Sequence, residues 1–506
     1  MVDPRTPVVV GVGEFAERVD DPDYRGLSPV DLAAEAVRTA LRDTETDVAA
    51  ITTAVDTASG MRQFETSHPY TPAPLGRSNN YPRSVANRVG LNPRRLILEV
   101  VGGDGPQKLV NEMAATIAGG KSDVALVFGS DATSTNRWFA KRDDKPDFTE
   151  TVNAELEDRG YGLEGLLTDY IINHGLVSAP TQYGILENAR RARLGQNKDE
   201  YARSMGELFA PMTRIAAANP LSASPVQRSA EELITVTADN RLICDPYPRL
   251  LVARDQVNQG AAALIMSTEV ARHFSIPEKK WVYLHGHADL REQELWGRPD
   301  LGGSPASTLA VEEAVRVAGI GIDDVDFFDI YSCFPYTVFN FCDGTGVATN
   351  DPRGFTVTGG LPYFGGAGNS YSMHAIVETV IATRDRPGSY GLVVANGGIT
   401  TKYSAGVYST AQRQWEADRS AQLQQRVEQA PRVGWTKVAD GAATVETYTI
   451  CHEWHDPIAV IVGKLDDSGD RFLSVSSDDN LITGGDLIGA RVKVSSTGGI
   501  NRSVPA

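Results

Sequence analysis

The cysteine and histidine residues are few, and their spacing limits the chemistry that they could support. The sequence contains four cysteines, Cys244, Cys333, Cys342 and Cys451. They are scattered and include no CxxC pair, which argues against a disulfide framework or a zinc site. His452 and His455 resemble a metal-binding pair, but in a strand-like segment this spacing directs the two side chains to opposite faces. We therefore expect no bound metal.

Three glycine-rich junctions are the other places where chemistry is conceivable. They are Gly102–Gly105, Gly365–Gly368 and the turn at Asn396–Gly398. Glycine permits positive φ and close backbone approach, and free N–H groups at a helix start can bind a carbonyl or phosphate group. Such turns also occur for structural reasons alone. His374 lies one helical turn after the second junction, where it could face that site or bond to a nearby carbonyl group.

The segments around these junctions alternate between strand-like and helical patterns. The apolar runs Val8–Val12, Leu96–Val101 and Val124–Phe128 predict buried strands. The apolar spacing of Asp31–Leu41 predicts an amphipathic helix, and Ala49–Val55 predicts another strand. Strands that alternate with helices predict parallel βαβ units and therefore an α/β fold.

The same order of elements returns in the second part of the chain. Pro305–Val317 and Tyr371–Ala382 predict helices, and Val325–Ile330 and Tyr390–Ala395 predict strands. In both parts a glycine-rich junction opens a helix, and a buried strand follows that helix. Residue identity between the parts is low, but the order of elements indicates an internal duplication.

This pattern divides the chain into five parts. Residues 1–130 and 258–275 form the first α/β half, and residues 276–410 form the second. Residues 131–257 form a polar, irregular insertion, which we interpret as a lid or binding segment because long insertions in compact folds are usually functional. Residues 411–433 predict a linker helix, and residues 434–506 predict a small β-barrel from their short alternating strands.

The composition excludes several classes of function. The chain has 506 residues, a net charge of −17 and a pI near 5.0. Such an acidic protein is not expected to bind nucleic acid, because neutralising phosphates requires a basic face. No apolar stretch is long enough to span a membrane, and the N-terminal segment lacks the pattern of a signal peptide. We therefore expect a cytoplasmic protein.

Several motifs resemble those of the thiolase superfamily. DQVNQGAAALIM at Asp255–Met266 resembles the SDGAAA segment, TGGLPYFGGAGN at Thr358–Asn369 resembles SGGLxxxGHPxGATG, and IYSCFPY at Ile330–Tyr336 resembles HDCF. The chain is most similar to thiolase-like protein type 1, which adds a small C-terminal domain. The resemblance implies two βαβαβαββ halves in a layered α-β-α-β-α arrangement, with an OB-like barrel at the C-terminus. It also implies an acetyl-CoA acetyltransferase-like activity.

Thiolase chemistry depends on residues that this sequence lacks. In the family, a cysteine at the start of a buried helix attacks an acyl thioester, a histidine activates it and a second cysteine transfers a proton. The matching positions here are Gly102, Gly366 and Asn396. Asp104, beside the first of them, is interpreted as a helix cap. We therefore do not expect covalent thiolase catalysis.

The HDCF-like motif leaves two candidate catalytic side chains, Tyr331 and Cys333. Cys333 could be a replacement nucleophile, or the cysteine that thiolases carry at this position without using it as one. Some aldolases of the superfamily use tyrosine as an acid or base, which implies such a role for Tyr331. The alternative for Tyr331 is a packed ring with a satisfied hydroxyl group. His374 is the third candidate.

A basic group in the insertion is the candidate binding site for coenzyme A. The resemblance implies that Arg190, Arg191 and Arg193 would hold coenzyme A or acyl-CoA as a substrate, together with Gly366. The same arginines could instead form a solvated helix face. We expect no covalently bound cofactor, no nucleic-acid partner, and a monomer or homodimer.

Three functions remain open on this evidence. The first is an acyl-CoA-handling protein of the acyltransferase class in lipid metabolism that lacks the usual nucleophile. The second is a retro-aldolase or related C–C lyase that depends on Tyr331. The third is a non-catalytic acyl-CoA-binding or scaffold protein.

Overall fold

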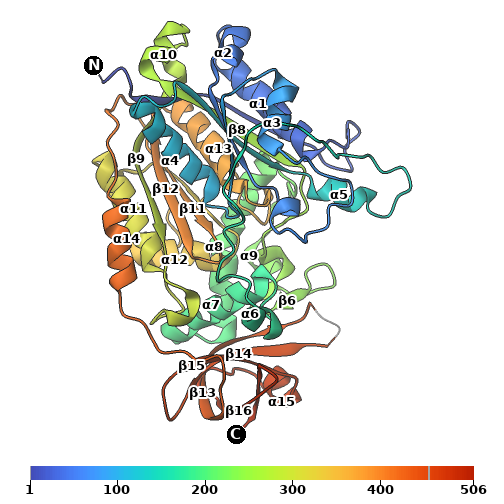
Figure 1. Ribbon diagram of the computed structural model, residues 1–506. Helices are drawn as coiled ribbons and strands as arrows, with labels where there is room; N and C mark the ends of the chain where they lie inside the picture. The colour runs from blue at the N-terminus through green and yellow to red at the C-terminus, as the bar shows by residue number, and fades with distance from the viewer. Residues whose placement is uncertain (1, 454–455) are drawn as a thin grey trace.

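The computed structural model describes residues 2–453 and 456–506 (Figure 1). The first half contributes the strands β1 (Pro7–Ala16), β2 (Thr57–Met61), β3 (Arg95–Glu99), β4 (Val124–Asp131) and β8 (Gln259–Ser267). They are arranged in the order β1-β8-β4-β2-β3. β2 is parallel to β3 and β4, whereas β8 is antiparallel to β1 and β4. The parallel pairs confirm the predicted α/β fold.

The second half repeats this arrangement. Its strands are β9 (Val282–Arg291), β10 (Phe327–Ile330), β11 (Gly391–Gly397) and β12 (Lys402–Ser409), in the order β9-β12-β11-β10. A short antiparallel pairing of β1 with β9 joins the two halves into one ten-stranded sheet that also includes β5 (Glu157–Asp158). The predicted duplication is confirmed.

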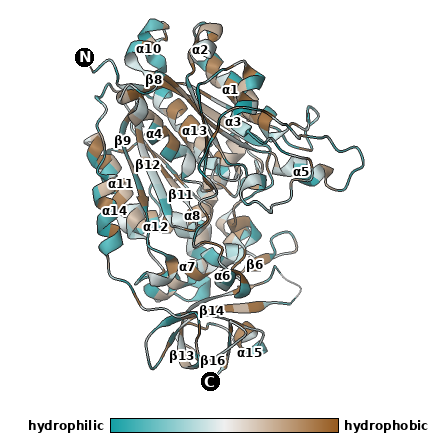
Figure 2. Ribbon diagram, viewed as in Figure 1, coloured by the Kyte–Doolittle hydropathy of each residue, from teal (hydrophilic) through white to brown (hydrophobic). Residues whose placement is uncertain are grey.

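Helices form the layers around these strands. α1 (Pro29–Asp43) packs on the first half and α11 (Pro305–Ala318) on the second, while α4 (Gly105–Ala118) and α13 (Tyr371–Asp385) pack against each other and against strands of both halves (Figure 1). Hydrophobic residues are concentrated on β8 and the strands beside it (Figure 2). The two helices that follow the first two glycine-rich junctions therefore lie in the centre of the molecule.

One predicted strand is a helix. The prediction of a strand at Ala49–Val55 is wrong, because residues 49–54 belong to α2 (Val48–Ala54) and Val55 is its C-cap. The Asp47 side chain caps this helix by accepting a hydrogen bond from the N–H of Ala49 at 3.0 Å. Only Ile51 of the helix is buried, so a surface helix with a strong N-cap outweighs the β-branched composition.

The insertion is mainly helical. Its longest helices are α7 (Ala179–Leu194) and α8 (Lys198–Ala218). Its shorter elements are α5 (Thr133–Phe139), α6 (Asp169–Asn173), α9 (Ala230–Ile234), β6 (Leu242–Cys244) and β7 (Tyr247–Pro248). Elsewhere in the chain lie α3 (Tyr81–Val89), α10 (Thr268–His273), α12 (Pro335–Thr345), α14 (Ser420–Gln429) and α15 (Asp479–Thr483).

The C-terminal segment forms the predicted β-barrel. Its strands are β13 (Gly441–Cys451), β14 (Ile458–Leu465), β15 (Arg471–Ser476), β16 (Arg491–Thr497) and β17 (Ile500–Pro505). β13 pairs with both β14 and β16, which closes the barrel of five strands. β6 of the insertion adds to β13 where Cys244 faces Cys451, so the insertion and the barrel share one sheet.

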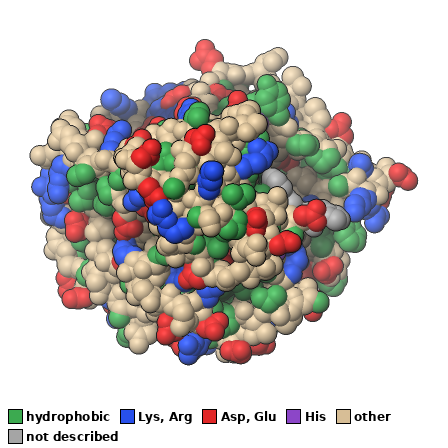
Figure 3. Space-filling model, turned by 90° about the horizontal axis from the view of Figure 1, so that it is seen from below, with side chains coloured by type: hydrophobic (Ala, Val, Ile, Leu, Met, Phe, Trp, Pro, Cys, Tyr) green, Lys and Arg blue, Asp and Glu red, His purple; other side chains and the backbone are tan. Residues whose placement is uncertain are grey.

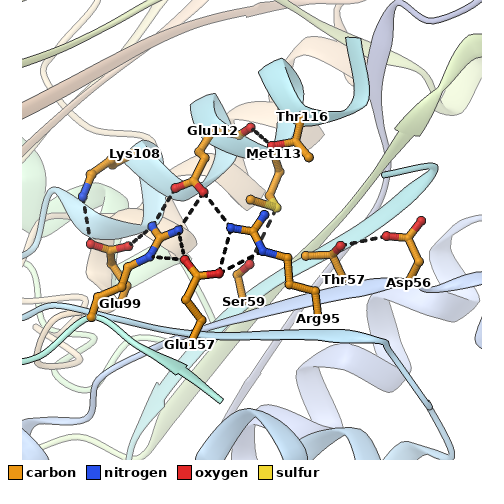
Figure 4. A network of polar contacts seen from close by, with 11 residues as sticks. Asp56, Thr57, Ser59, Arg95, Glu99, Lys108, Glu112, Met113, Thr116 and Glu157 are labelled. Atoms are coloured by element: carbon orange, nitrogen blue, oxygen red, sulfur yellow. Dashed lines mark hydrogen bonds and ion pairs between the residues drawn. The ribbon is translucent and has the colours of Figure 1, made fainter. Parts of the chain in front are cut away.

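A short strand of the insertion, β5, and several charged side chains cover the outer edge of β3. β5 pairs with β3, and Arg159 just after β5 binds Glu99 and Glu112 at 2.6 Å each. Lys108 also binds Glu99, at 2.8 Å (Figure 4). An edge strand that is paired and charged is protected from pairing with another chain.

No helix within the described ranges is long and apolar enough to cross a membrane.

Candidate active site at the glycine-rich junctions

The fold brings the two helix-opening junctions into contact. The N–H of Gly102, between β3 and α4, donates to Asn369 Oδ1 at 3.0 Å. The hydroxyl group of Ser372, in the first turn of α13, donates to the carbonyl group of Gly103. These bonds join residues that are more than 260 positions apart in the sequence.

The carboxyl group of Asp104 fills the space beside Gly102 and Gly397. A Cβ atom built on Gly102 would lie 2.2 Å from Asp104 Oδ1, and one built on Gly397 would lie 2.0 Å from the same oxygen. Gly102 has φ of +151°, which disfavours any other residue. The junction therefore excludes a cysteine at position 102 by both backbone conformation and contact.

Asp104 is not the helix cap that its position predicted. It stands at the N-cap of α4, but its side chain accepts no capping hydrogen bond. Only 5% of its surface is exposed, and Oδ1 has no hydrogen-bond partner in the part of the chain that the structure describes. Burial raises the pKa of Asp104, and the cations of Lys402 and Lys108 offset part of this effect.

Tyr331 lies directly against the first junction. A Cβ atom on Gly103 would lie 2.3 Å from the hydroxyl oxygen of Tyr331, so glycine is required for the ring to fit. The ring also packs edge-on against Tyr371, with centroids 5.5 Å apart. Burial raises the pKa of Tyr331 well above 10, and nearby Cys333 and Asp104 raise it further. At neutral pH the phenol stays protonated, so it can donate a proton or a hydrogen bond but cannot act as a base.

Cys333 and Asn396 meet at a third residue, Tyr183. The Asn396 amide donates to Tyr183 Oη at 2.7 Å and lies 3.9 Å from Cys333 Sγ. Burial raises the pKa of Cys333 to about 12, although a hydrogen bond with Tyr183 lowers it somewhat. The side chain is therefore a thiol at neutral pH, and a thiol is a poor nucleophile.

Tyr183 was missed by sequence reasoning. It comes from α7 of the insertion and stacks on Phe334 with ring centroids 4.4 Å apart. A single tyrosine in this helix has no motif around it, so only the folded chain shows that it reaches the junction.

His374 is held by a carboxyl group rather than by a carbonyl group. Its Nδ1 bonds to Glu14 of β1, and its ring packs edge-on against Phe364 at 5.1 Å. Burial lowers the pKa of His374 and raises that of Glu14, which favours a neutral pair. These contacts are with β1 and with the loop before α13, and they do not include Tyr331 or Asn396.

The backbone of Gly366 is already used by the chain. Its N–H donates to the carbonyl group of Arg254 at 2.7 Å, and its own carbonyl group accepts from Gly368 at 2.7 Å. The second junction therefore holds the segment that enters β8.

The three arginines of the insertion are paired with carboxylates. Arg190 binds Asp343 at 2.7 and 2.8 Å, and Arg191 binds Asp486 at 2.6 and 2.8 Å. Arg193 binds Asp343 at 2.6 Å. Arg190 and Arg191 are buried, so the alternative of a solvated helix face is wrong for both. They connect α7 to α12 and to the C-terminal barrel.

The described residues contain no group of three or more His, Cys, Asp or Glu side chains that could hold a metal ion. His452 follows the end of β13, and His455 lies outside the described residues. Figure 3 shows the molecule from below, on the side where the C-terminal barrel lies in Figure 1. This face carries acidic and basic side chains side by side, without a continuous basic patch among the residues drawn.

Comparison with known proteins places the whole chain next to one solved structure. A monomeric SCP2-thiolase-like protein type 1 from Mycobacterium smegmatis is 50% identical, with a TM-score of 0.87 and 100% of both chains covered. A family profile described as the thiolase-like protein type 1 additional C-terminal domain matches residues 422–499. No curated protein sequence matches the chain.

More distant structures share the fold. The Ltp2-ChsH2(DUF35) aldolase is 18% identical with a TM-score of 0.60, over 82% of this chain and 100% of that one. The dimeric peroxisomal thiolase of Saccharomyces cerevisiae is 14% identical with a TM-score of 0.57, over 81% of this chain and 98% of that one.

Proposed function

The chain belongs to the thiolase-like protein type 1 family, and we propose that it binds an acyl thioester such as acyl-CoA without forming an acyl-enzyme. The observation that carries this proposal is the buried Asp104 carboxyl group, which takes the space beside Gly102 and Gly397. A carboxylate at that place would also repel a thiolate or an acyl oxyanion. A role in lipid metabolism is part of the proposal and follows from the thioester.

The other candidate nucleophile and bases support the same conclusion. Cys333 is a buried thiol, and Tyr331 is a protonated phenol. His374 is bonded to Glu14 in a buried pair. With Gly102, Gly366 and Asn396 at the positions of the thiolase residues, none of these groups supplies an activated nucleophile at the junction.

The test combines ligand binding with detection of a covalent adduct. Thermal unfolding is followed with coenzyme A, acetyl-CoA, acetoacetyl-CoA and longer acyl-CoAs, and the intact mass is measured after each incubation. A ligand at a hundredfold excess over its Kd stabilises the native state by about 2.7 kcal/mol. We expect a shift with one class of acyl-CoA and no added mass. An acyl adduct would refute the proposal.

A second candidate function is cleavage of a carbon–carbon bond with Tyr331 as the acid. The observation in its favour is the Tyr331 hydroxyl group, which faces Gly103 and has no hydrogen-bond partner among the described residues. In such a cleavage of a β-hydroxyacyl thioester, water takes the β-hydroxyl proton as the carbonyl product forms, and the protonated phenol donates a hydrogen bond to the enolate oxygen as the carbon–carbon bond breaks. The enolate then takes up a proton from water.

Two matched variants test this second function. Tyr331→Phe removes the candidate acid, and Tyr363→Phe removes another buried hydroxyl group, one that has no hydrogen-bond partner in the described part of the chain. If the function is correct, cleavage of a β-hydroxyacyl-CoA is lost with the first variant and kept with the second. Equal turnover in both variants removes the function. Binding without turnover in the parent protein would leave a non-catalytic binding protein.

A further inference from the structure

The turn that joins β11 to β12 has a strained backbone at two residues. Ile399 and Thr400 have φ of +51° and +62°, although both are branched at Cβ. A left-handed conformation is an outlier for such residues, because the Cβ atom crowds the backbone. It persists only where the surrounding structure holds it. Since this turn follows Asn396 closely, it determines where the Asn396 amide lies.

A buried arginine holds the strained turn. Arg298 is 2% exposed, and its guanidinium group donates to the carbonyl oxygen and to the hydroxyl oxygen of Thr400, at 2.7 and 2.8 Å. Its Nε donates to the carbonyl group of Gln293 at 2.9 Å. The guanidinium group is a rigid planar fork, so two bonds to one residue fix the orientation of that residue as well as its position. Arg298 therefore holds Thr400 in its left-handed conformation.

The C-terminal barrel holds Arg298 in turn. Arg471 of β15 is fully buried, and it donates to the carbonyl groups of Trp296 and Arg298 at 2.8 and 2.6 Å. The other two nitrogens of its guanidinium group bind Glu446 of β13 at 2.7 Å each. The barrel therefore reaches the strained turn through two arginines, although the turn belongs to the second α/β half.

The barrel also holds the other side of the junction. Tyr183, which accepts the hydrogen bond of Asn396, lies in α7. Figure 1 shows α7 directly above the barrel, and the two are in contact through β13. Thr447 of β13 donates to the carbonyl group of Ile185 in α7 at 2.7 Å. Both partners of the bond between Asn396 and Tyr183 are thus attached to the same domain.

We propose that the C-terminal barrel positions the Asn396–Tyr183 pair, with Arg298 and Arg471 as the positioning residues. Arg471 fixes Arg298, Arg298 fixes Thr400, and the turn then presents the Asn396 amide to Tyr183. This gives a role to the additional domain that the family profile matches. The proposal rests on the proposed function in taking this junction as the binding site, but its tests need no ligand.

Hydrogen–deuterium exchange measures how firmly the turn is held. The variants are Arg298→Met and Arg471→Met, which remove the donors and keep an unbranched side chain. The matched control is Arg491→Met, because Arg491 lies in the same barrel and binds Asp466 of that barrel at an exposed position. Peptides that cover residues 396–403 should exchange about tenfold faster or more in the two variants, and at the parent rate in the control.

Replacing Ile399 with glycine separates strain in the turn from a general loss of packing. Glycine adopts positive φ readily, so the turn of Ile399→Gly needs less support from Arg298. Arg298→Met should therefore speed exchange by at most about threefold in the Ile399→Gly background. An equal increase in both backgrounds would overturn the proposal, because Arg298 would then only stabilise the fold.

The thiol of Cys333 reports on the pair itself. Its Sγ lies 3.9 Å from the Asn396 amide, whereas Cys342 is a buried thiol of α12 and serves as the internal reference for global unfolding. A thiol reagent should label Cys333 faster in Arg471→Met than in the parent and should label Cys342 at the parent rate, as peptide mapping would show. Parallel acceleration of the two thiols would contradict the proposal, because Arg471 would then support the whole fold rather than the turn.

The acyl-CoA thermal shift of the parent protein tests the proposed function separately, since neither exchange nor labelling involves a ligand. If neither arginine variant folds, Thr400→Val decides the question, because it keeps the shape of the side chain and removes one acceptor of Arg298. We expect faster exchange of residues 396–403 in Thr400→Val. Exchange at the parent rate in Thr400→Val or in Arg298→Met, or equally fast exchange in Arg491→Met, would overturn the proposal.

Discussion

Restoring the missing cysteine should fail to restore a thiolase nucleophile. In Gly102→Cys the new Cβ would lie 2.2 Å from Asp104 Oδ1, at a backbone φ of +151°. A non-glycine residue in such a conformation costs about 1–3 kcal/mol. Moving a buried carboxyl group adds to this cost, because the rearrangement disturbs a packed core by about 1–3 kcal/mol. We expect the free energy of unfolding to fall by roughly 2–6 kcal/mol.

Urea unfolding of four variants, Gly102→Cys, Gly441→Cys, Asp104→Ala and Gly102→Cys/Asp104→Ala, measures the two contributions separately. Gly441→Cys is the control for the backbone, because Gly441 has φ of +129° and open space where a Cβ would lie. The difference between Gly102→Cys and Gly441→Cys reports the contact with Asp104. In the double variant Gly102→Cys/Asp104→Ala this contact is absent, so Gly102→Cys should cost less stability in the Asp104→Ala background than in the parent.

Acetylation of the new cysteine provides a chemical test. Intact mass after incubation with acetyl-CoA should show no acetyl group on Gly102→Cys, because a carboxylate beside the new sulfur raises the pKa of the thiol. A variant that is as stable as the parent and becomes acetylated at neutral pH would refute the account of the junction given above.

Three further predictions concern the covered edge of the sheet and the buried thiol. Burial raises the pKa of Glu99, but the cations of Lys108 and Arg159 outweigh this effect, so the pKa of the folded protein is lowered. The ionised Glu99 carboxylate therefore stabilises the fold above its unfolded pKa, and this stabilisation is lost as the pH falls through the folded pKa. Glu99→Gln should therefore lower the urea midpoint at pH 7 and have a smaller effect at low pH; an equal effect at both would contradict this. Arg159→Glu should repel β5 from its acidic neighbours and expose the edge of β3. The exposed edge should cause self-association, which light scattering would detect. The control variant Arg203→Glu should scatter light no more than the parent protein. Cys333 should react with a thiol reagent at pH 7.4 only after unfolding, and rapid labelling of the native protein would contradict the raised pKa of about 12.

Much of the fold was predictable because it rests on local patterns. The apolar runs at Val8–Val12 and Val124–Phe128 lie within β1 and β4, and the helical spacing of Tyr371–Ala382 lies within α13. The order of strands, junctions and helices sufficed to indicate the duplication. The helix α2 was missed because its signal is a single capping residue, Asp47, rather than a periodic pattern.

The candidate site was only partly predictable. The motif around Ile330–Tyr336 and the glycines at 102 and 397 identified the junction, and the structure places Tyr331, Cys333 and Asn396 there. The sequence could not show that the partner of Asn396 is Tyr183, which is 213 positions away.

By itself, the sequence predicted which thiolase positions lack the residues of the family and indicated where the chain must turn closely, because residue type and the freedom of glycine are local properties. The tertiary structure decided where each charge is used. Arg190 and Arg191 find Asp343 and Asp486 at separations of 153 and 295 residues, while the buried ammonium group of Lys402 donates to the carbonyl groups of Val101 and Gly162. Which partner a charge finds depends on distances of a few ångströms between segments that only the fold brings together.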